Sequence, residues 1–222
     1  MEGQDRKSRM NALRELELPR SLFHVLLVGV WGVRGLAEHH QPLLWFTFFA
    51  VVIWEILRRY LPHINRLPML EFILRRREGR GITPAPFFLL AVLLITNCFT
   101  EEVSSTAIFI TALADPASRI FGKLFGRHRI GGSRKTWVGT AACFLTAFLV
   151  VFALQYFHEH HPLAATVLLG LAAAVTAVIA EVVIPVVAPR LLDDNFWIPL
   201  LCAVSIHLVK LAARGALFDN LT

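Results

Sequence analysis

Cysteine is scarce in this chain of 222 residues, and the three cysteines, Cys98, Cys143 and Cys202, lie far apart in apolar stretches. No two of them form a C-x-x-C pair, so the sequence favours neither a zinc site nor a disulfide framework. Common motifs are missing too. The glycine-rich segment 126–136 does not have GxxxxGK[ST] spacing, and the chain contains no GxSxG and no HExxH. These absences exclude P-loop nucleotide hydrolases, serine hydrolases of the nucleophile-elbow type and HExxH metalloproteases.

Charged residues are also few. They make up 17% of the chain, against about 25% in soluble domains, whereas 56% of the residues are hydrophobic. The apolar stretches are too many and too long for one soluble core, and we expect an all-α, polytopic membrane protein with about seven transmembrane helices. The expected spans are 22–37, 41–57, 86–100, 102–114, 138–157, 163–184 and 196–213. The fourth is the shortest, and we expect its helix to continue through Asp115 toward Gly122.

The basic residues predict the orientation. Only Arg34, Lys210 and Arg214 among the 22 lysines and arginines fall on one side of the predicted spans, so the other side, with the N-terminus, is expected to be cytoplasmic. The net charge of +6 then reflects topology and contact with anionic lipids, not nucleic-acid binding. We expect an interfacial helix in residues 1–20 and one transmembrane catalytic domain over 21–222, with basic inner loops 58–84 and 115–136.

Ionisable side chains at the ends of the spans are costly and therefore informative. Glu55, Asp115, Glu181 and Asp194 all fall near the predicted cytoplasmic side, the side of the basic loops. Purely structural roles are the alternatives. Asp115 has the i,i+4 spacing for a salt bridge with Arg119. Glu181 would pair with a charged residue of a neighbouring helix, and Asp194 would cap the last helix.

Asp115 ends an apolar run and is followed within one loop by six basic residues and four glycines. Carboxylate oxygens bind hard cations such as Mg²⁺, whereas lysine, arginine and backbone amides exposed at glycines bind phosphate oxygens. The combination beside a bilayer predicts phosphoryl or nucleotidyl transfer at a membrane surface.

Four segments together resemble one known family. Residues 17–24 (ELPRSLFH), 78–83 (EGRGIT), 115–126 with 135–139 (DPASRIFGKLFG and KTWVG), and Glu181 with 194–200 (DNFWIPL) occur in the order expected. They resemble the CTP-dependent polyprenol, dolichol, phytol and diacylglycerol kinases, distant relatives of the phosphatidate cytidylyltransferases. The chain departs from the family pattern at Ser21, where the family has Lys, at Ala114, where it has Gly, and at Val138, where it has Glu.

The resemblance implies CTP as the phosphoryl donor, a membrane alcohol as the acceptor and Mg²⁺ as the metal. By the same resemblance, Asp115, Glu181 and Asp194 are the expected metal ligands, and these three with Lys135 are the expected catalytic residues. The residues expected to hold nucleotide or phosphate are Arg119, Lys123, Gly131, Gly132, Arg134, Lys135 and Thr136. The residues expected to contact the lipid are Arg20, His24 and Asn195.

Two other functions stay open at this point. A cytidylyltransferase would use the same segments to make a CDP-lipid. A catalytically silent membrane protein would bind or move an anionic lipid, and Val138 favours it. The expected partners are the bilayer, the lipid substrate and CTP, and a homodimer is one expected assembly. The expected location is the inner membrane of a bacterium, or the endoplasmic reticulum or plastid membrane of a eukaryote.

Overall fold

The computed structural model describes residues 25, 26, 29, 41–61, 82–131, 133, 135–184 and 194–219, and it describes side chains of the last segment from 195 to 213. The regular secondary structure of the described residues is helical, with no strand beyond one isolated bridge between Arg129 and Thr136. The helices are α3 (Gln41–Tyr60), α5 (Ala85–Cys98), α6 (Glu101–Phe125), α7 (Trp137–Phe152) with η2 (Ala153–His158), α8 (Leu163–Val178) with η3 (Ile179–Val183), and α10 (Asp194–Asp219). The predicted all-α class is therefore confirmed.

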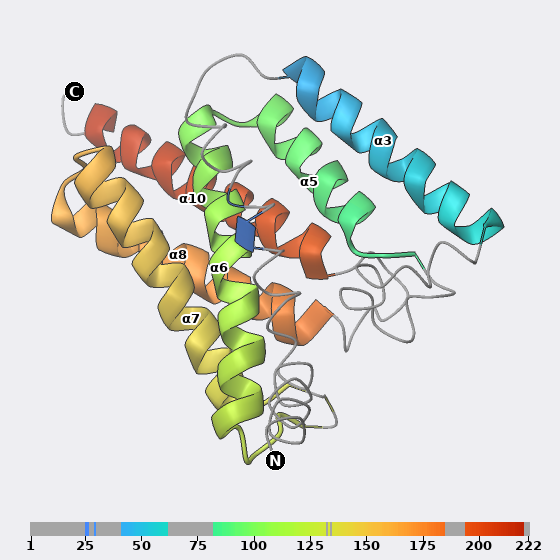
Figure 1. The fold of residues 1–222 in the computed structure, drawn as a ribbon. Coiled ribbons are helices and arrows are strands. Elements are labelled where there is room, and N and C mark those ends of the chain that lie inside the picture. The colour runs from blue at the N-terminus through green and yellow to red at the C-terminus, as the bar shows by residue number, and fades with distance from the viewer. Residues whose placement is uncertain are drawn as a thin grey trace, which may run out of the picture.

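The helices form one bundle in which α6 packs against α7, α7 against α8, α8 against α10, and α10 against both α5 and α6, while α3 contacts the bundle through α5 (Figure 1). Alanines supply much of the core: Ala107, Ala112, Ala147, Ala173 and Ala177 have almost no exposed surface. Small side chains let helix backbones approach closely, which is the usual way in which helices pack in membranes.

Large apolar side chains also cover the outside of the bundle. Phe46 is 71% exposed, and Phe49, Leu145, Leu149 and Leu168 are each more than half exposed. An outer surface of this kind would aggregate in water and is typical of helices that face lipid. The structure thus supports an integral membrane protein.

Four described helices are long and apolar enough to cross a membrane: 41–60, 137–158, 163–183 and 195–213. The predicted count of about seven spans is not confirmed. With 14 residues, α5 is about 21 Å long, shorter than the hydrocarbon core of a bilayer. The 25 residues of α6 include charges at both ends, and the first expected span, 22–37, lies almost wholly outside the described residues. The predicted interfacial helix in 1–20 also lies outside them.

The chain direction alternates, so the bundle has two distinct ends (Figure 1). At one end, here called the site end, α3, α6 and η3 finish and α5, α7 and α10 begin. The segments 82–84 and 126–136 lie there. The predicted inner loop 115–136 is therefore only partly a loop, because residues 115–125 belong to helix α6, and its place on the cytoplasmic side stays a prediction. The other end, called the far end, contains the start of α6, the connection between α7 and α8, and the last turns of α10.

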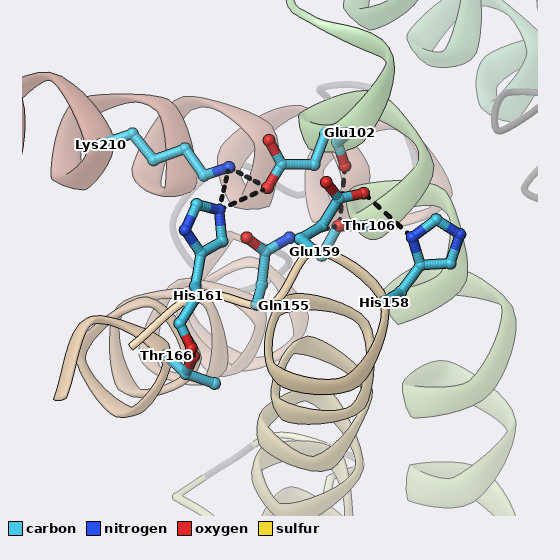
Figure 2. Close-up of polar contacts among 8 residues, drawn as sticks. All are labelled: Glu102, Thr106, Gln155, His158, Glu159, His161, Thr166 and Lys210. Carbon is cyan, nitrogen blue, oxygen red and sulfur yellow. Dashed lines mark hydrogen bonds and ion pairs between the residues drawn. The ribbon is translucent and has the colours of Figure 1, made fainter. Parts of the chain in front are cut away.

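A polar cluster joins three elements at the far end (Figure 2). The Glu102 carboxylate of α6 accepts a hydrogen bond from the Lys210 ammonium of α10, and the His161 ring lies 3.2 Å from the same carboxylate. Below it, the Gln155 amide donates to the Thr106 hydroxyl at 3.2 Å. These contacts connect the helix ends on the side of the bundle opposite to the candidate site.

Candidate functional site

One face of α6 carries Asp115, Ser118 and Arg119 within about one helical turn, as their i, i+3 and i+4 spacing requires. Asp115 is fully buried, and its Oδ2 lies 2.6 Å from an Arg119 guanidinium nitrogen. The salt bridge that the spacing allows therefore forms. Pro116, in the middle of α6, has no amide to donate, which leaves a backbone carbonyl of the preceding turn beside these polar groups.

Glu181 reaches this face of α6 from the end of α8. Its side chain is fully buried and accepts a hydrogen bond from the Ser118 hydroxyl. Lys135 lies two residues before the start of α7, and its ammonium nitrogen is 2.9 Å from Glu181 Oε1. Glu181 sits in η3, a π-helical turn, and π turns inside helices are frequent at functional sites because they change the direction of one side chain.

Cys143 of α7 is fully buried one turn after Gly139, which packs against Ser118 of α6. Ser118 in turn donates to Glu181 from the turn of α6 that carries Asp115. Asp115, Lys135 and Glu181, which are separated in the sequence and lie on three elements, therefore come together at the site end. We call Asp115, Ser118, Arg119, Lys135 and Glu181 the buried cluster.

Glycines hold α6 and α7 close enough to make this cluster. A Cβ atom at Gly139 would lie 2.8 Å from the backbone oxygen of Ser118, and one at Gly122 would lie 3.0 Å from the Thr136 hydroxyl. Real side chains do not approach so closely, so only glycine fits without a shift of the helices. Gly126 meets Thr136 in the same way. Ser118, Gly122 and Gly126 thus form a small-residue stripe with four-residue spacing, the kind that lets membrane helices touch.

The loop between α6 and α7 folds back on itself and positions Lys135 beside Glu181. The Ile130 amide donates to the Lys135 carbonyl at 2.9 Å, and Gly131 takes a positive φ of 53°, which favours glycine. Thr136 then caps α7, because its hydroxyl accepts the Gly139 amide at 3.2 Å. The Thr136 hydroxyl therefore has a structural role as cap and helix contact, while its predicted phosphate contact stays a prediction.

The remaining predicted site residues fall into two groups. Lys123 is exposed on the last turn of α6, and Asn195 is buried in the first turn of α10, which lies at the site end; α10 packs against η3. The other predicted residues lie outside the described residues or, for Asp194, have a side chain outside them: Arg20, His24, Gly132, Arg134 and Asp194. All the functional roles assigned from the sequence remain predictions.

Glu55, an acid that the sequence places near the predicted cytoplasmic side, lies outside the buried cluster. It is not an unpaired acid of the buried cluster, because its Oε1 lies 2.5 Å from the Arg58 guanidinium, one turn further along α3. The Thr83 amide and hydroxyl each donate to Glu55 at 3.0 Å. Glu55 therefore fastens the segment that leads into α5 to the end of α3.

Ser118 and Cys143 were not predicted as site residues. The signal for Ser118 was available, since it lies three residues after Asp115 and so shares its helix face. Cys143 follows Gly139 by four residues on the face of α7 that meets α6, but this face can be recognised only once the partner helix is known.

Two curated proteins are similar to this chain. The first is a CTP-dependent diacylglycerol kinase 1 of Eremothecium gossypii, 25% identical over 219 residues, a match that covers 87% of this chain and 67% of that protein. The second is a chloroplastic phytol kinase 1 of Arabidopsis thaliana, 28% identical over 142 residues, which covers 60% of this chain and 46% of that protein.

The predicted resemblance to the CTP-dependent lipid kinases is confirmed. Both relatives are named as kinases, in agreement with the expectation of a phosphotransferase. The matches span about two thirds and about half of the lengths of the two relatives. No family model matches the chain, and no solved structure matches it.

Proposed function

We propose that this protein is a CTP-dependent lipid kinase that transfers the γ-phosphoryl group of CTP to the hydroxyl of a membrane alcohol at the cytoplasmic face. The acceptor class is a polyprenol, a phytol-like alcohol or diacylglycerol. One observation carries the proposal. The buried carboxylates Asp115 and Glu181 and the cationic side chains of Arg119 and Lys135 meet at one end of a helical bundle, in a chain similar to two named lipid kinases.

The donor set suits Mg²⁺. Glu181 Oε2 is buried and has no hydrogen-bond partner in the described part of the chain, an arrangement that is costly for a carboxylate oxygen unless a cation or water satisfies it. No three acidic, histidine or cysteine side chains gather among the described residues. Mg²⁺ commonly takes one or two carboxylates and fills its shell with phosphate and water oxygens. Asp115 and Glu181, with Asp194, would hold the ion, which when bound would neutralise charge on the phosphate oxygens.

The cations of the cluster would change partners when the nucleotide binds. Without it, Arg119 neutralises Asp115 and Lys135 neutralises Glu181. Buried charges need such compensation. Once CTP and the metal enter, the carboxylates would face the metal, and Arg119 and Lys135 would turn to the phosphate oxygens, joined by Lys123, Arg134 and the amides of Gly131 and Gly132. The added cations would offset most of the negative charge that CTP brings to the buried cluster.

Phosphoryl transfer depends mainly on position and charge neutralisation. The acceptor oxygen would attack the γ-phosphorus, CDP would leave, and the hydroxyl proton would pass to a carboxylate, Asp194 or Glu181. The lipid tail would stay in the bilayer, with its head near Arg20, His24 and Asn195.

The position of a radiolabel distinguishes this proposal from its alternatives. Purified protein, Mg²⁺ and a panel of lipid alcohols are incubated with CTP labelled at the γ- or the α-phosphate, and phosphatidate is included in the panel. A kinase moves only the γ-label into lipid and releases CDP. A cytidylyltransferase moves the α-label into lipid and releases pyrophosphate, and a silent lipid-binding protein moves neither. Transfer of the α-label alone, or of no label with any lipid, contradicts the proposal.

A further inference from the structure

An open groove of about 630 Å³ lies at the site end, where α6 finishes and α7 begins. It is distinct from the buried cluster and shares no residue with it. Its six lining residues are Phe125, Arg127, His128, Arg129, Trp137 and Val138.

The geometry of α7 separates the groove from the buried cluster. Gly139 packs against Ser118 of α6, and Cys143, one turn further along α7, is fully buried. Residues four apart share a helix face, whereas Trp137 and Val138 point elsewhere on the circumference. A ligand in the groove would therefore lie beside the cluster without occupying it.

The groove combines positive charge with apolar surface. Arg127, His128 and Arg129 are exposed, and within the described ranges no carboxylate forms an ion pair with either arginine. Phe125 is 60% exposed and Trp137 is 62% exposed. A ligand that matches this surface has a negatively charged part and a hydrocarbon part.

The loop backbone fixes the basic residues opposite the tryptophan. The Trp137 amide donates to the His128 carbonyl at 3.2 Å, and Arg129 forms its isolated bridge with Thr136. The groove is thus held together by the same hairpin that orients Lys135. Trp137 is also the first residue of an apolar helix that is long enough to cross a membrane. Tryptophan is enriched at the ends of such helices, where they meet the membrane–water interface.

We propose that this groove binds the phosphate head group of an anionic phospholipid from the surrounding leaflet. Arg127 and Arg129 hold the phosphate oxygens, as guanidinium groups do in bidentate contacts, and His128 adds a further donor. Phe125, Trp137 and Val138 cover the start of the acyl chains. The occupant is a lipid because a soluble phosphate would leave the two exposed aromatic walls uncovered.

Quenching of Trp137 fluorescence by brominated lipid tests the proposal. The full chain is placed in phosphatidylcholine nanodiscs without nucleotide, and phosphatidic acid or phosphatidylcholine with brominated acyl chains is added. We expect brominated phosphatidic acid to quench at much lower mole fraction, and the difference to disappear in Trp137→Phe but to persist in Trp54→Phe. The double variant Arg127→Gln/Arg129→Gln should bind phosphatidic acid on the order of 25-fold more weakly.

Two further variants serve as a second test of the groove and as a control. Val138→Glu places a negative charge in the groove without removing any of its basic residues, and it should also weaken binding. Arg59→Gln removes an exposed positive charge from the end of α3, at the site end but away from the groove, and should leave binding unchanged. Circular dichroism and size-exclusion chromatography confirm that each variant is folded.

Three results would overturn the proposal. The first is equal quenching by the two lipids, and the second is unchanged binding in both groove variants. The third is displacement of phosphatidic acid by CTP or inorganic phosphate at comparable concentrations, which would make the groove a site for soluble phosphates. Because the measurement uses no nucleotide, its outcome does not depend on kinase activity.

Discussion

Substitution of Lys135 by methionine tests the charge balance of the buried cluster. Methionine keeps an unbranched stem of similar length but removes the ammonium group that lies 2.9 Å from Glu181 Oε1. Glu181 has no exposed surface, whereas 24% of the Lys135 side chain is exposed. In the variant the carboxylate keeps the Ser118 hydroxyl as a donor but loses its neighbouring cation.

The magnitude follows from burial. Removal of one partner from a fully buried ion pair costs about 3–5 kcal/mol of stability. Because a quarter of the Lys135 side chain is exposed and Glu181 is able to take up a proton, we expect about 2–3 kcal/mol. A second change, Glu181→Gln, removes the stranded charge and keeps an acceptor for Ser118. The double variant should therefore be more stable than Lys135→Met alone, with a coupling energy of about 1.5–2 kcal/mol.

The assay is thermal unfolding of the wild type, both single variants and the double variant in one detergent. For a chain of this size, the expected loss in Lys135→Met is a drop of about 5–10 °C in Tm. Arg59→Met is the matched control, since it removes an exposed cation at the same end of the bundle and should leave the Tm unchanged. If the two single losses simply add in the double variant, the pair carries no coupling and the reasoning is wrong.

Three further substitutions test other contacts. Gly139→Leu should lower the Tm by several degrees and reduce transfer, because even its Cβ would meet the Ser118 backbone oxygen at 2.8 Å; unchanged unfolding would show that the helices are not in contact there. Ser118→Ala removes a donor to a charged group, so we expect roughly a tenfold loss of activity in a steady-state assay, and full activity would contradict a role for this hydroxyl. Glu102→Gln should lower the Tm without changing the KM for CTP, since its contacts are at the far end, whereas exposed Glu101→Gln should change neither.

The helix positions were largely predictable from the sequence. The expected spans 138–157 and 163–184 agree with 137–158 and 163–183, because strongly apolar stretches there are bounded by polar loops. The continuation of the fourth helix past Asp115 was also predicted, and α6 extends to Phe125. Membrane crossing was harder to predict for two helices. The helix α5 has only 14 residues, which is short for a span, and α6 contains charged residues at both ends.

The proximity of three predicted site residues agrees with the sequence, whereas their contacts were not predictable and their functional roles stay predictions. Orientation placed Asp115, Lys135 and Glu181 on one side of the membrane, and the structure brings them together. The Lys135–Glu181 pair joins residues 46 positions apart on different elements, so no local periodicity indicates it. The contact between Thr83 and Glu55 is also non-local, because the two residues are 28 positions apart.

The most direct test of the central claim is γ-phosphoryl transfer from CTP to lipid by the wild type and Asp115→Asn, measured side by side in membranes that contain equal amounts of inserted protein. Asparagine has nearly the same shape but lacks the negative charge that balances Arg119 and that we propose to bind the metal. The account predicts transfer by the wild type and a loss of at least about a thousandfold in the variant, the scale on which key electrostatic groups act. Full activity of Asp115→Asn would contradict it.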